Sequence, residues 1–156
     1  MKTKVYIETS VVSYLTSAPS RGPIVAAHQR LTRAWWRRRE RFDLFVSEAV
    51  MEEITAGHPK AAAKRMAALH GLPVLKVDAA IDVLTRRLIT SGAVPPNAEH
   101  DAIHIAAAAV HRLDVLLTWN CRHIANAAAR GKIGQVCREG GYVPPVLCTP
   151  EELGAD

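Results

Sequence analysis

The sequence predicts an α/β protein whose central, mostly parallel sheet of four or five strands is covered by helices on both faces. Short apolar runs alternate with helical stretches along the 156 residues, an order typical of parallel sheets. The run Val115–Thr118 contains no charged residue, as expected of a strand that is buried on both faces. Because no internal repeat or linker interrupts this pattern, we expect one domain over residues 1–156.

The expected strands are the short apolar runs at residues 4–7, 43–46, 73–77, 115–118 and 145–148. Helices are expected over about residues 9–17, 23–41, 48–56, 60–70, 79–90 and 98–111, within 122–139, and at 151–153. Ser47 and Asp78 are placed to cap the helices that follow them, and Gly71 to end one. The helical stretch 122–139 is expected to be interrupted around Gly131 and Gly134.

Charge and cysteine content indicate the kind of partner and the compartment to expect. The net charge of +5 equals the charge of residues 28–41 alone, which contain six Arg and one Glu. This segment is therefore expected to form a local surface that faces an anion. No apolar run is long enough to span a bilayer, and the start leads directly into a strand without a secretory signal. The three cysteines are odd in number and widely spaced, which indicates free thiols in a reducing cytoplasm.

Four polar residues fall where an open α/β sheet binds ligands. Glu8 and Asn120 each follow a predicted strand, and Asp101 lies in the first turn of a predicted helix. Since strand ends and the starts of the following helices share one edge of a parallel sheet, these three side chains can meet there. Glu53 lies further along its helix, so its position alone does not place it with these three side chains.

Clustered carboxylates repel each other unless a cation lies between them. Oxygen ligands favour Mg²⁺ or Mn²⁺ over softer metals, and such an ion activates water and stabilises charge on a phosphoryl oxygen. The spacing alone equally allows Glu8, Asp101 and Asn120 to be independent helix and turn caps, with Glu53 a surface residue.

Four segments in this order resemble the PIN-domain family, and most closely the VapC-type toxins of bacterial and archaeal toxin–antitoxin pairs. They are Ile7–Ser10, Ser47–Glu53, Asp101–Ala108 and Leu116–Asn120. The resemblance implies an α/β/α sandwich, an acidic pocket that binds Mg²⁺ or Mn²⁺, metal-dependent cleavage of RNA, and a cognate antitoxin as partner. A homodimer is expected because such folds often pair.

Residue by residue, the resemblance places the family's first acid on Glu8, where Asp is usual, and the next two on Glu53 and Asp101. The fourth acidic position falls on Asn120, which carries no negative charge. Thr9 and Ser10 match the polar residues that follow the first acid, and a hydroxyl there is expected to contact metal-bound water.

This assignment gives each residue a role. Glu8 and Asp101 hold the metal, Glu53 orients or helps deprotonate the attacking water, and Asn120 fixes the geometry. The missing charge at Asn120 predicts one well-held metal with any second ion weakly bound. The two departures also leave open a non-catalytic PIN-like module that binds RNA or a protein partner through its basic helix.

The basic helix carries a second set of candidate residues. Arg30, Arg33, Arg37 and Arg41 share one face of the predicted helix, Trp36 lies beside them, and Trp35 falls on the apolar face. The arginines are interpreted as a solvated face, as a contact for an antitoxin or second subunit, or as RNA contacts with Trp36 stacking on a base.

His100 and His104 stand four residues apart, as in helical zinc sites. The intervening acid is the shorter Asp101 and no third ligand is evident, so a zinc hydrolase is a minor alternative. His104 is expected to be a hydrogen-bonded histidine beside the pocket, or to contact a substrate phosphate.

Overall fold

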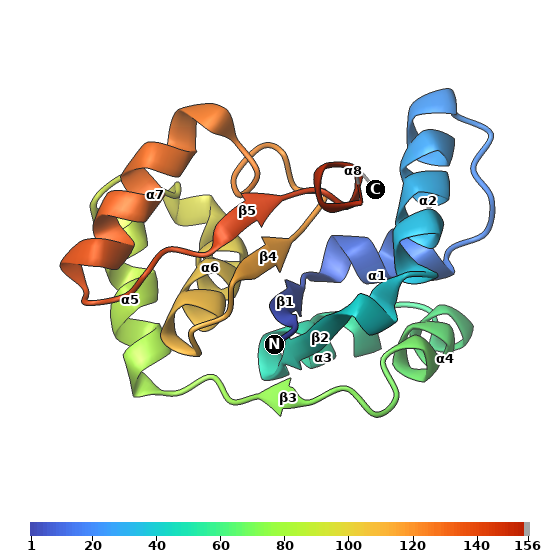
Figure 1. The fold of residues 1–156 in the computed structure, drawn as a ribbon, viewed down its shortest axis with the longest axis horizontal. Coiled ribbons are helices and arrows are strands. Elements are labelled where there is room, and N and C mark those ends of the chain that lie inside the picture. Colours follow the sequence, from blue (N-terminus) through green and yellow to red (C-terminus); the bar gives the residue numbers. More distant parts are fainter. Residues whose placement is uncertain (155–156) are drawn as a thin grey trace.

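A five-stranded sheet, parallel throughout, forms the centre of the protein in a computed structural model that describes residues 1–154 (Figure 1). The strands are β1 (Thr3–Ile7), β2 (Phe42–Ser47), β3 (Val74–Leu75), β4 (Val115–Leu117) and β5 (Val146–Cys148), in the spatial order β3-β2-β1-β4-β5. This confirms the predicted parallel α/β fold.

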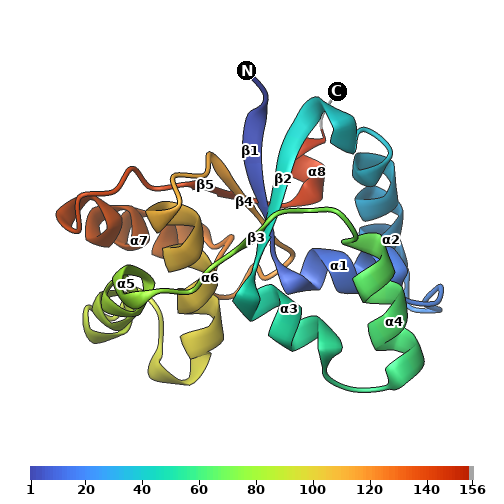
Figure 2. The same ribbon diagram turned by 90° about the horizontal axis from the view of Figure 1, so that it is seen from below.

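Helices cover both faces of the sheet. They are α1 (Thr9–Thr16), α2 (Pro23–Trp36), α3 (Glu48–Thr55), α4 (Pro59–Ala68), α5 (Ala79–Thr90), α6 (Glu99–Val110), α7 (Ala127–Glu139) and α8 (Pro150–Leu153), with 3₁₀ turns at Arg39–Arg41 and Pro96–Ala98. Figure 2 shows α5, α6 and α7 on one side of the sheet and α1, α2 and α4 on the other. The three layers are those of an α/β/α sandwich.

The strand order reverses at β1. The chain first builds β2 and β3 on one side of β1, and then crosses to the other side to add β4 and β5. The backbone N–H of Glu8 donates to the carbonyl of Leu117 at 3.1 Å, so the carboxyl ends of β1 and β4 lie side by side. In open α/β sheets the crevice beside such a reversal is the usual ligand site.

The core lies on both sides of the central strands. Val5, Tyr6 and Ile7 of β1 are fully buried, and so is the alanine run 106–109 of α6, whose small side chains let that helix pack closely. Trp35 is also buried, which confirms its expected place in the core.

Two expectations about helices were wrong. Helix α7 continues through Gly131 and Gly134 without a break. At Gly134 a Cβ atom would lie 3.1 Å from Nη1 of Arg138 and 3.6 Å from Cγ of Pro144, so the helix packs closely at this glycine, and one or two glycines cost a 13-residue helix only about 1 kcal/mol each. The helix from residue 23 ends at Trp36 and not near residue 41, because a 3₁₀ turn leads into β2.

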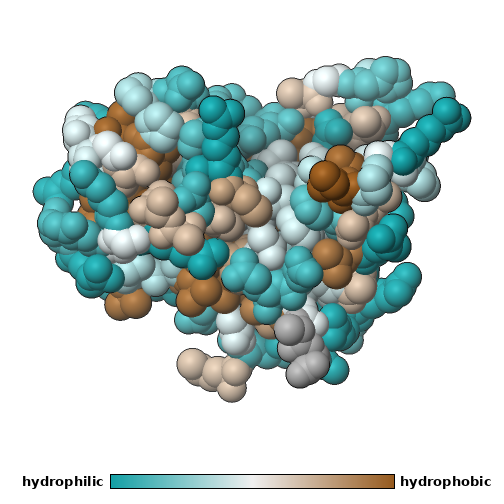
Figure 3. Space-filling model, turned by 90° about the horizontal axis from the view of Figure 1, so that it is seen from above, coloured by the Kyte–Doolittle hydropathy of each residue, from teal (hydrophilic) through white to brown (hydrophobic). Residues whose placement is uncertain are grey.

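The surface is mixed in character. On the face shown in Figure 3, apolar residues are interspersed with polar ones and form no single continuous patch. Within the described part of the chain, no helix combines the length and the apolar character that crossing a membrane requires.

Candidate metal centre

Glu8 is held at the reversal point by neutral hydrogen-bond donors. Its carboxylate is 6% exposed and caps α1, where Oε2 accepts the backbone N–H of Ser10 at 3.1 Å. Oε1 accepts the hydroxyl of Ser10 and, at 2.6 Å, the hydroxyl of Thr118 directly after β4. These contacts fix the carboxylate where β1, β4 and α1 meet.

Glu53, on α3, is hydrogen-bonded to a buried histidine in the same region. Its Oε1 lies 2.5 Å from Nε2 of His104 on α6. The other imidazole nitrogen, Nδ1, lies 2.7 Å from the hydroxyl of Tyr6, which lies 2.7 Å from Oγ of Ser47. Since Tyr6, Ser47 and His104 are at most 1% exposed, a chain of hydrogen bonds runs from the sheet interior to the Glu53 carboxylate.

One arrangement of protons satisfies every group in this chain. The Ser47 hydroxyl, which accepts the N–H of Val50 at 3.3 Å, donates to Tyr6, and Tyr6 donates to Nδ1 of His104. Nε2–H of a neutral His104 then donates to Glu53. A doubly protonated His104 would reverse the first two bonds and leave the buried Ser47 hydroxyl without an acceptor, so this hydrogen-bond arrangement fits the tautomer with its proton on Nε2.

Burial and the neighbouring imidazoles act on Glu53 in opposite directions. Burial alone would raise the pKa of its carboxyl, but the hydrogen bond from His104 and the positive charges of His104 and His100, when protonated, outweigh that effect. The pKa of Glu53 is therefore lowered and the carboxylate is ionised at neutral pH. Burial also raises the pKa of Tyr6 far above its usual value, so that hydroxyl keeps its proton.

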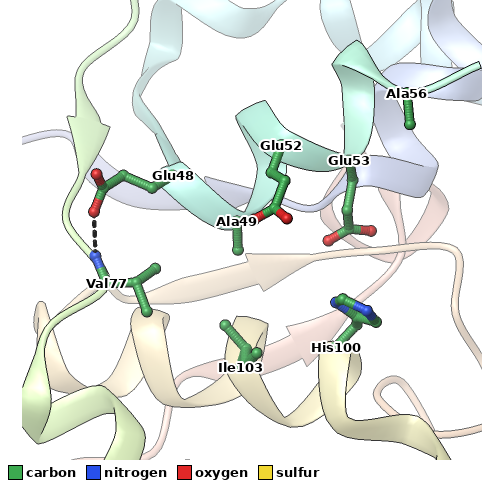
Figure 4. Close-up of a pocket in the computed structure, with 8 residues that line it drawn as sticks. All are labelled: Glu48, Ala49, Glu52, Glu53, Ala56, Val77, His100 and Ile103. Carbon is green, nitrogen blue, oxygen red and sulfur yellow. Dashed lines mark hydrogen bonds between the residues drawn. The ribbon is translucent and has the colours of Figure 1, made fainter.

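A cleft of about 340 Å³ opens beside Glu53, between α3 and α6. Figure 4 shows Glu52 and Glu53 of α3 on one wall, facing His100 and Ile103 of α6 on the other. Ala49, Ala56 and Val77 also line this cleft, which we call the α3–α6 cleft, and Glu48 accepts the N–H of Val77 at 2.7 Å.

Glu8, Glu53 and His104 form a possible metal-binding group. One ligand atom from each lies within 4.8 Å of the others, close enough for a single ion to contact all three after small side-chain rotations. The hydroxyl of Thr9, the residue after Glu8, is buried, makes no hydrogen bond of good geometry among the described residues, and lies near enough to Glu53 to lower the pKa of that carboxyl. A buried hydroxyl with so weak a partner, beside two carboxylates, fits a site completed by an ion and its water. Carboxylates suit Mg²⁺ or Mn²⁺, and His104 would add a nitrogen ligand, which favours Mn²⁺, only with Nε2 deprotonated and its bond to Glu53 given up.

Two residues expected from the sequence stand outside this group. Asp101 is half-buried one helical turn before His104 on α6, and it is not among the clustered ligands. Asn120 uses its Oδ1 to accept the backbone N–H groups of Arg122 at 3.2 Å and His123 at 3.0 Å. The amide oxygen therefore holds a turn, and Nδ2 is the atom of Asn120 that remains to donate to a ligand.

The basic residues near α2 do not form one helix face, because α2 ends before Arg37. Arg30, Arg37 and Arg41 are exposed. Arg33 donates to the carbonyl of Ser17 at 3.0 Å, and Arg39 stacks on half-buried Trp36 with its Cζ 4.9 Å from the ring centre.

Sequence reasoning placed Ser47 as a helix cap, which the structure confirms, but did not assign Tyr6, Thr118 or the hydrogen bond between Ser47 and Tyr6. Tyr6 lies two residues before Glu8 in a strand, and alternate residues of a strand share a face. A tyrosine buried on the face of a proposed acid needs a partner for its hydroxyl, and that requirement is the signal that could have identified it.

The protein is a parallel α/β/α sandwich with a candidate acidic metal site at its strand reversal. A solved protein of similar fold is the toxin VapC20 of Mycobacterium tuberculosis, whose crystal structure is described as that of a sarcin–ricin loop cleaving toxin. The two structures superpose with a TM-score of 0.60 over 76% of this chain and 92% of that chain, at 16% sequence identity. At that identity the likeness shows the fold alone. No family model matches the sequence, and neither does any curated protein.

Proposed function

We propose that this protein is a divalent-metal-dependent ribonuclease, the toxin of a toxin–antitoxin pair with a cognate antitoxin as partner. The observation that carries the proposal is the group Glu8, Glu53 and His104 at the strand reversal of a fold shared with a toxin structure. Clustered carboxylates with a buried, hydrogen-bonded orienting residue are the arrangement that metal-assisted hydrolysis requires.

In this proposal Glu8 holds the ion, and Asp101 completes its coordination from the first turn of α6. Bound Mg²⁺ or Mn²⁺ would lower the pKa of water and stabilise charge developing on the phosphoryl group. His104 adds a nitrogen donor, or orients Glu53 when its Nε2 keeps the proton.

Glu53 is proposed to accept the proton of the attacking water. Its Oε1 is engaged by His104, which leaves Oε2 to accept a proton. The lowered pKa keeps the base ionised at neutral pH. Asn120 donates from Nδ2 to the substrate phosphate, because its oxygen is already engaged.

The test is cleavage of an RNA panel in Mn²⁺, Mg²⁺, Zn²⁺ or EDTA by wild type, Glu53→Gln and Asp101→Asn. Activity in Mn²⁺ and its loss in EDTA are expected, with each variant slowed by about a hundredfold or more. Equal rates for the three proteins would refute the assigned roles, and activity with Zn²⁺ alone would restore the zinc alternative. The melting temperature gives an independent reading, because Mn²⁺ at 100 times its Kd adds about 2.7 kcal/mol of stability.

A non-catalytic module that binds RNA or a protein remains the second candidate. The commitment of the Asn120 oxygen to a backbone turn favours it, since this position then offers neither a charge nor a free oxygen to an ion. Such a module would keep its affinity for RNA in EDTA and cut none of the panel in Mn²⁺.

A further inference from the structure

A second cleft, of about 350 Å³, lies between α1 and α4 and has the opposite charge character to the α3–α6 cleft. We call it the α1–α4 cleft. No carboxylate contributes to its lining in the described chain. Its polar lining residues are Ser13, Thr16, Ser17, His58, Lys60, Lys64 and Arg65. A concave surface of hydroxyls and cations is suited to an anion.

The two lysines of the α1–α4 cleft are available to a ligand. Lys60 and Lys64 lie four residues apart on α4, so they share a face of that helix. Both are exposed, and neither side chain takes part in a hydrogen bond or salt bridge within residues 1–154. Arg65 has a different task, since its guanidinium donates to the carbonyls of Ile54 at 2.9 Å and Ala56 at 2.8 Å and closes the end of α3.

Two further donors point to the same kind of ligand. Nδ1 of His58 accepts the backbone N–H of Lys60 at 3.2 Å, which leaves Nε2–H of the neutral ring as a donor. The Ser13 hydroxyl has no side-chain hydrogen bond in the described structure, whereas Thr16 donates to the carbonyl of Val12 at 3.0 Å.

The α1–α4 cleft lies next to the candidate metal centre along two elements. Helix α1 begins directly after Glu8, and Ser13 follows Thr9 by about 6 Å of helix axis. Helix α3 carries Glu53 and ends at Thr55, three residues before His58. The cleft therefore starts within one or two helical turns of the carboxylates. At that distance, the phosphates next to a scissile bond at the carboxylates would lie in the cleft along a bound RNA strand.

Charge decides which cleft a polyanion would follow. The α3–α6 cleft presents Glu48, Glu52 and Glu53 against a single imidazole, and it repels phosphate (Figure 4). We propose that the α1–α4 cleft binds the phosphodiester backbone of single-stranded RNA next to the scissile bond. Lys60 and Lys64 contact phosphate oxygens, with His58 and Ser13 as neutral donors. This inference rests on the proposed ribonuclease function.

The test measures binding of a labelled single-stranded RNA in EDTA at several salt concentrations, so that binding is read without cleavage. Lys60→Glu/Lys64→Glu should weaken binding by roughly tenfold at low salt and reduce the slope of log K against log salt by about 1.4, since each phosphate contact on a single strand contributes about 0.7. Lys60→Gln/Lys64→Gln removes the same contacts without adding charge and should lose the same slope. The exposed pair Arg86→Glu/Lys132→Glu, on α5 and α7 at the other side of the sheet, changes net charge equally and is the matched control, with its slope kept.

Equal slopes for wild type and both lysine variants would overturn the inference. A similar loss in the Arg86→Glu/Lys132→Glu control would overturn it too, because the effect would then follow net charge and not the cleft. A labelled hexaglutamate peptide that binds as tightly as RNA and is lost in the lysine variants would assign the cleft to an acidic protein segment instead. Cleavage in Mn²⁺ is measured separately, so a protein that binds RNA here but cuts none would refute the nuclease alone.

Discussion

Replacing Tyr6 with Phe tests the buried hydrogen-bond chain beneath the candidate metal centre. The substitution keeps the ring and removes a hydroxyl that lies 2.7 Å from both Ser47 and His104. All three side chains are at most 1% exposed, so water does not replace the lost partner. Each buried group left without a partner costs about 1–3 kcal/mol, and the two together should cost roughly 2–6 kcal/mol. That is a large part of the total stability of about 5–15 kcal/mol that small domains have.

The assay is urea unfolding in EDTA, where the midpoint should fall while the m value stays unchanged. Tyr14→Phe is the matched control, because the Tyr14 hydroxyl makes no side-chain hydrogen bond in the described residues, and its midpoint should stay within about 0.5 kcal/mol of wild type. A Tyr6→Phe variant as stable as Tyr14→Phe would refute the chain. If the chain also orients Glu53, Tyr6→Phe should lower kcat of the proposed nuclease more than it changes KM.

Three further outcomes follow from the structure. Because the pKa of Glu53 is lowered in the folded protein, its ionised carboxylate stabilises the fold above the unfolded pKa, and this stability is lost as pH falls through the folded pKa. Between about pH 6 and 3 the melting temperature of Glu53→Gln should therefore fall less steeply than that of wild type. Parallel curves for the two proteins would contradict this. Burial raises the pKa of Cys137 and of Cys148 to about 11, so a thiol reagent at neutral pH should modify exposed Cys121 first and the other two only after unfolding, as mass spectrometry would show. Asn126 caps α7 by accepting the N–H of Ala128 at 2.9 Å, and Asn126→Ala should cost about 1 kcal/mol in urea unfolding, whereas an unchanged midpoint would mean that the cap contributes nothing.

Sequence reasoning predicted the sheet well because its signals are local. Apolar runs such as Val115–Leu117 and caps such as Ser47 and Asp78 depend on a few neighbouring residues, and each occurs where expected. The helix end at Trp36, where a 3₁₀ turn leads into β2, and the continuity of α7 through Gly131 and Gly134 are not marked by the periodicity of apolar residues.

In the candidate site, too, the local features were predicted and the contacts between distant residues were not. Glu8 was placed from its position after a strand, and the structure puts it where β1 and β4 meet. The link from Tyr6 through His104 to Glu53 joins three elements whose side-chain directions are set by packing, so spacing alone did not reveal it. The part played by Asp101 remains a prediction.

The hydrogen bonds around Glu8 and Glu53 also have a consequence for when the site appears during folding. Glu8 to Thr118 spans 110 residues of chain, Tyr6 to His104 spans 98, and Glu53 to His104 spans 51. Contacts between such distant residues require most of the chain to be ordered and form late. A nascent chain that has not yet reached α6 and β4 contains both glutamates but no assembled centre. Any chemistry of this site therefore begins only after the chain has been synthesised past Thr118 and has folded.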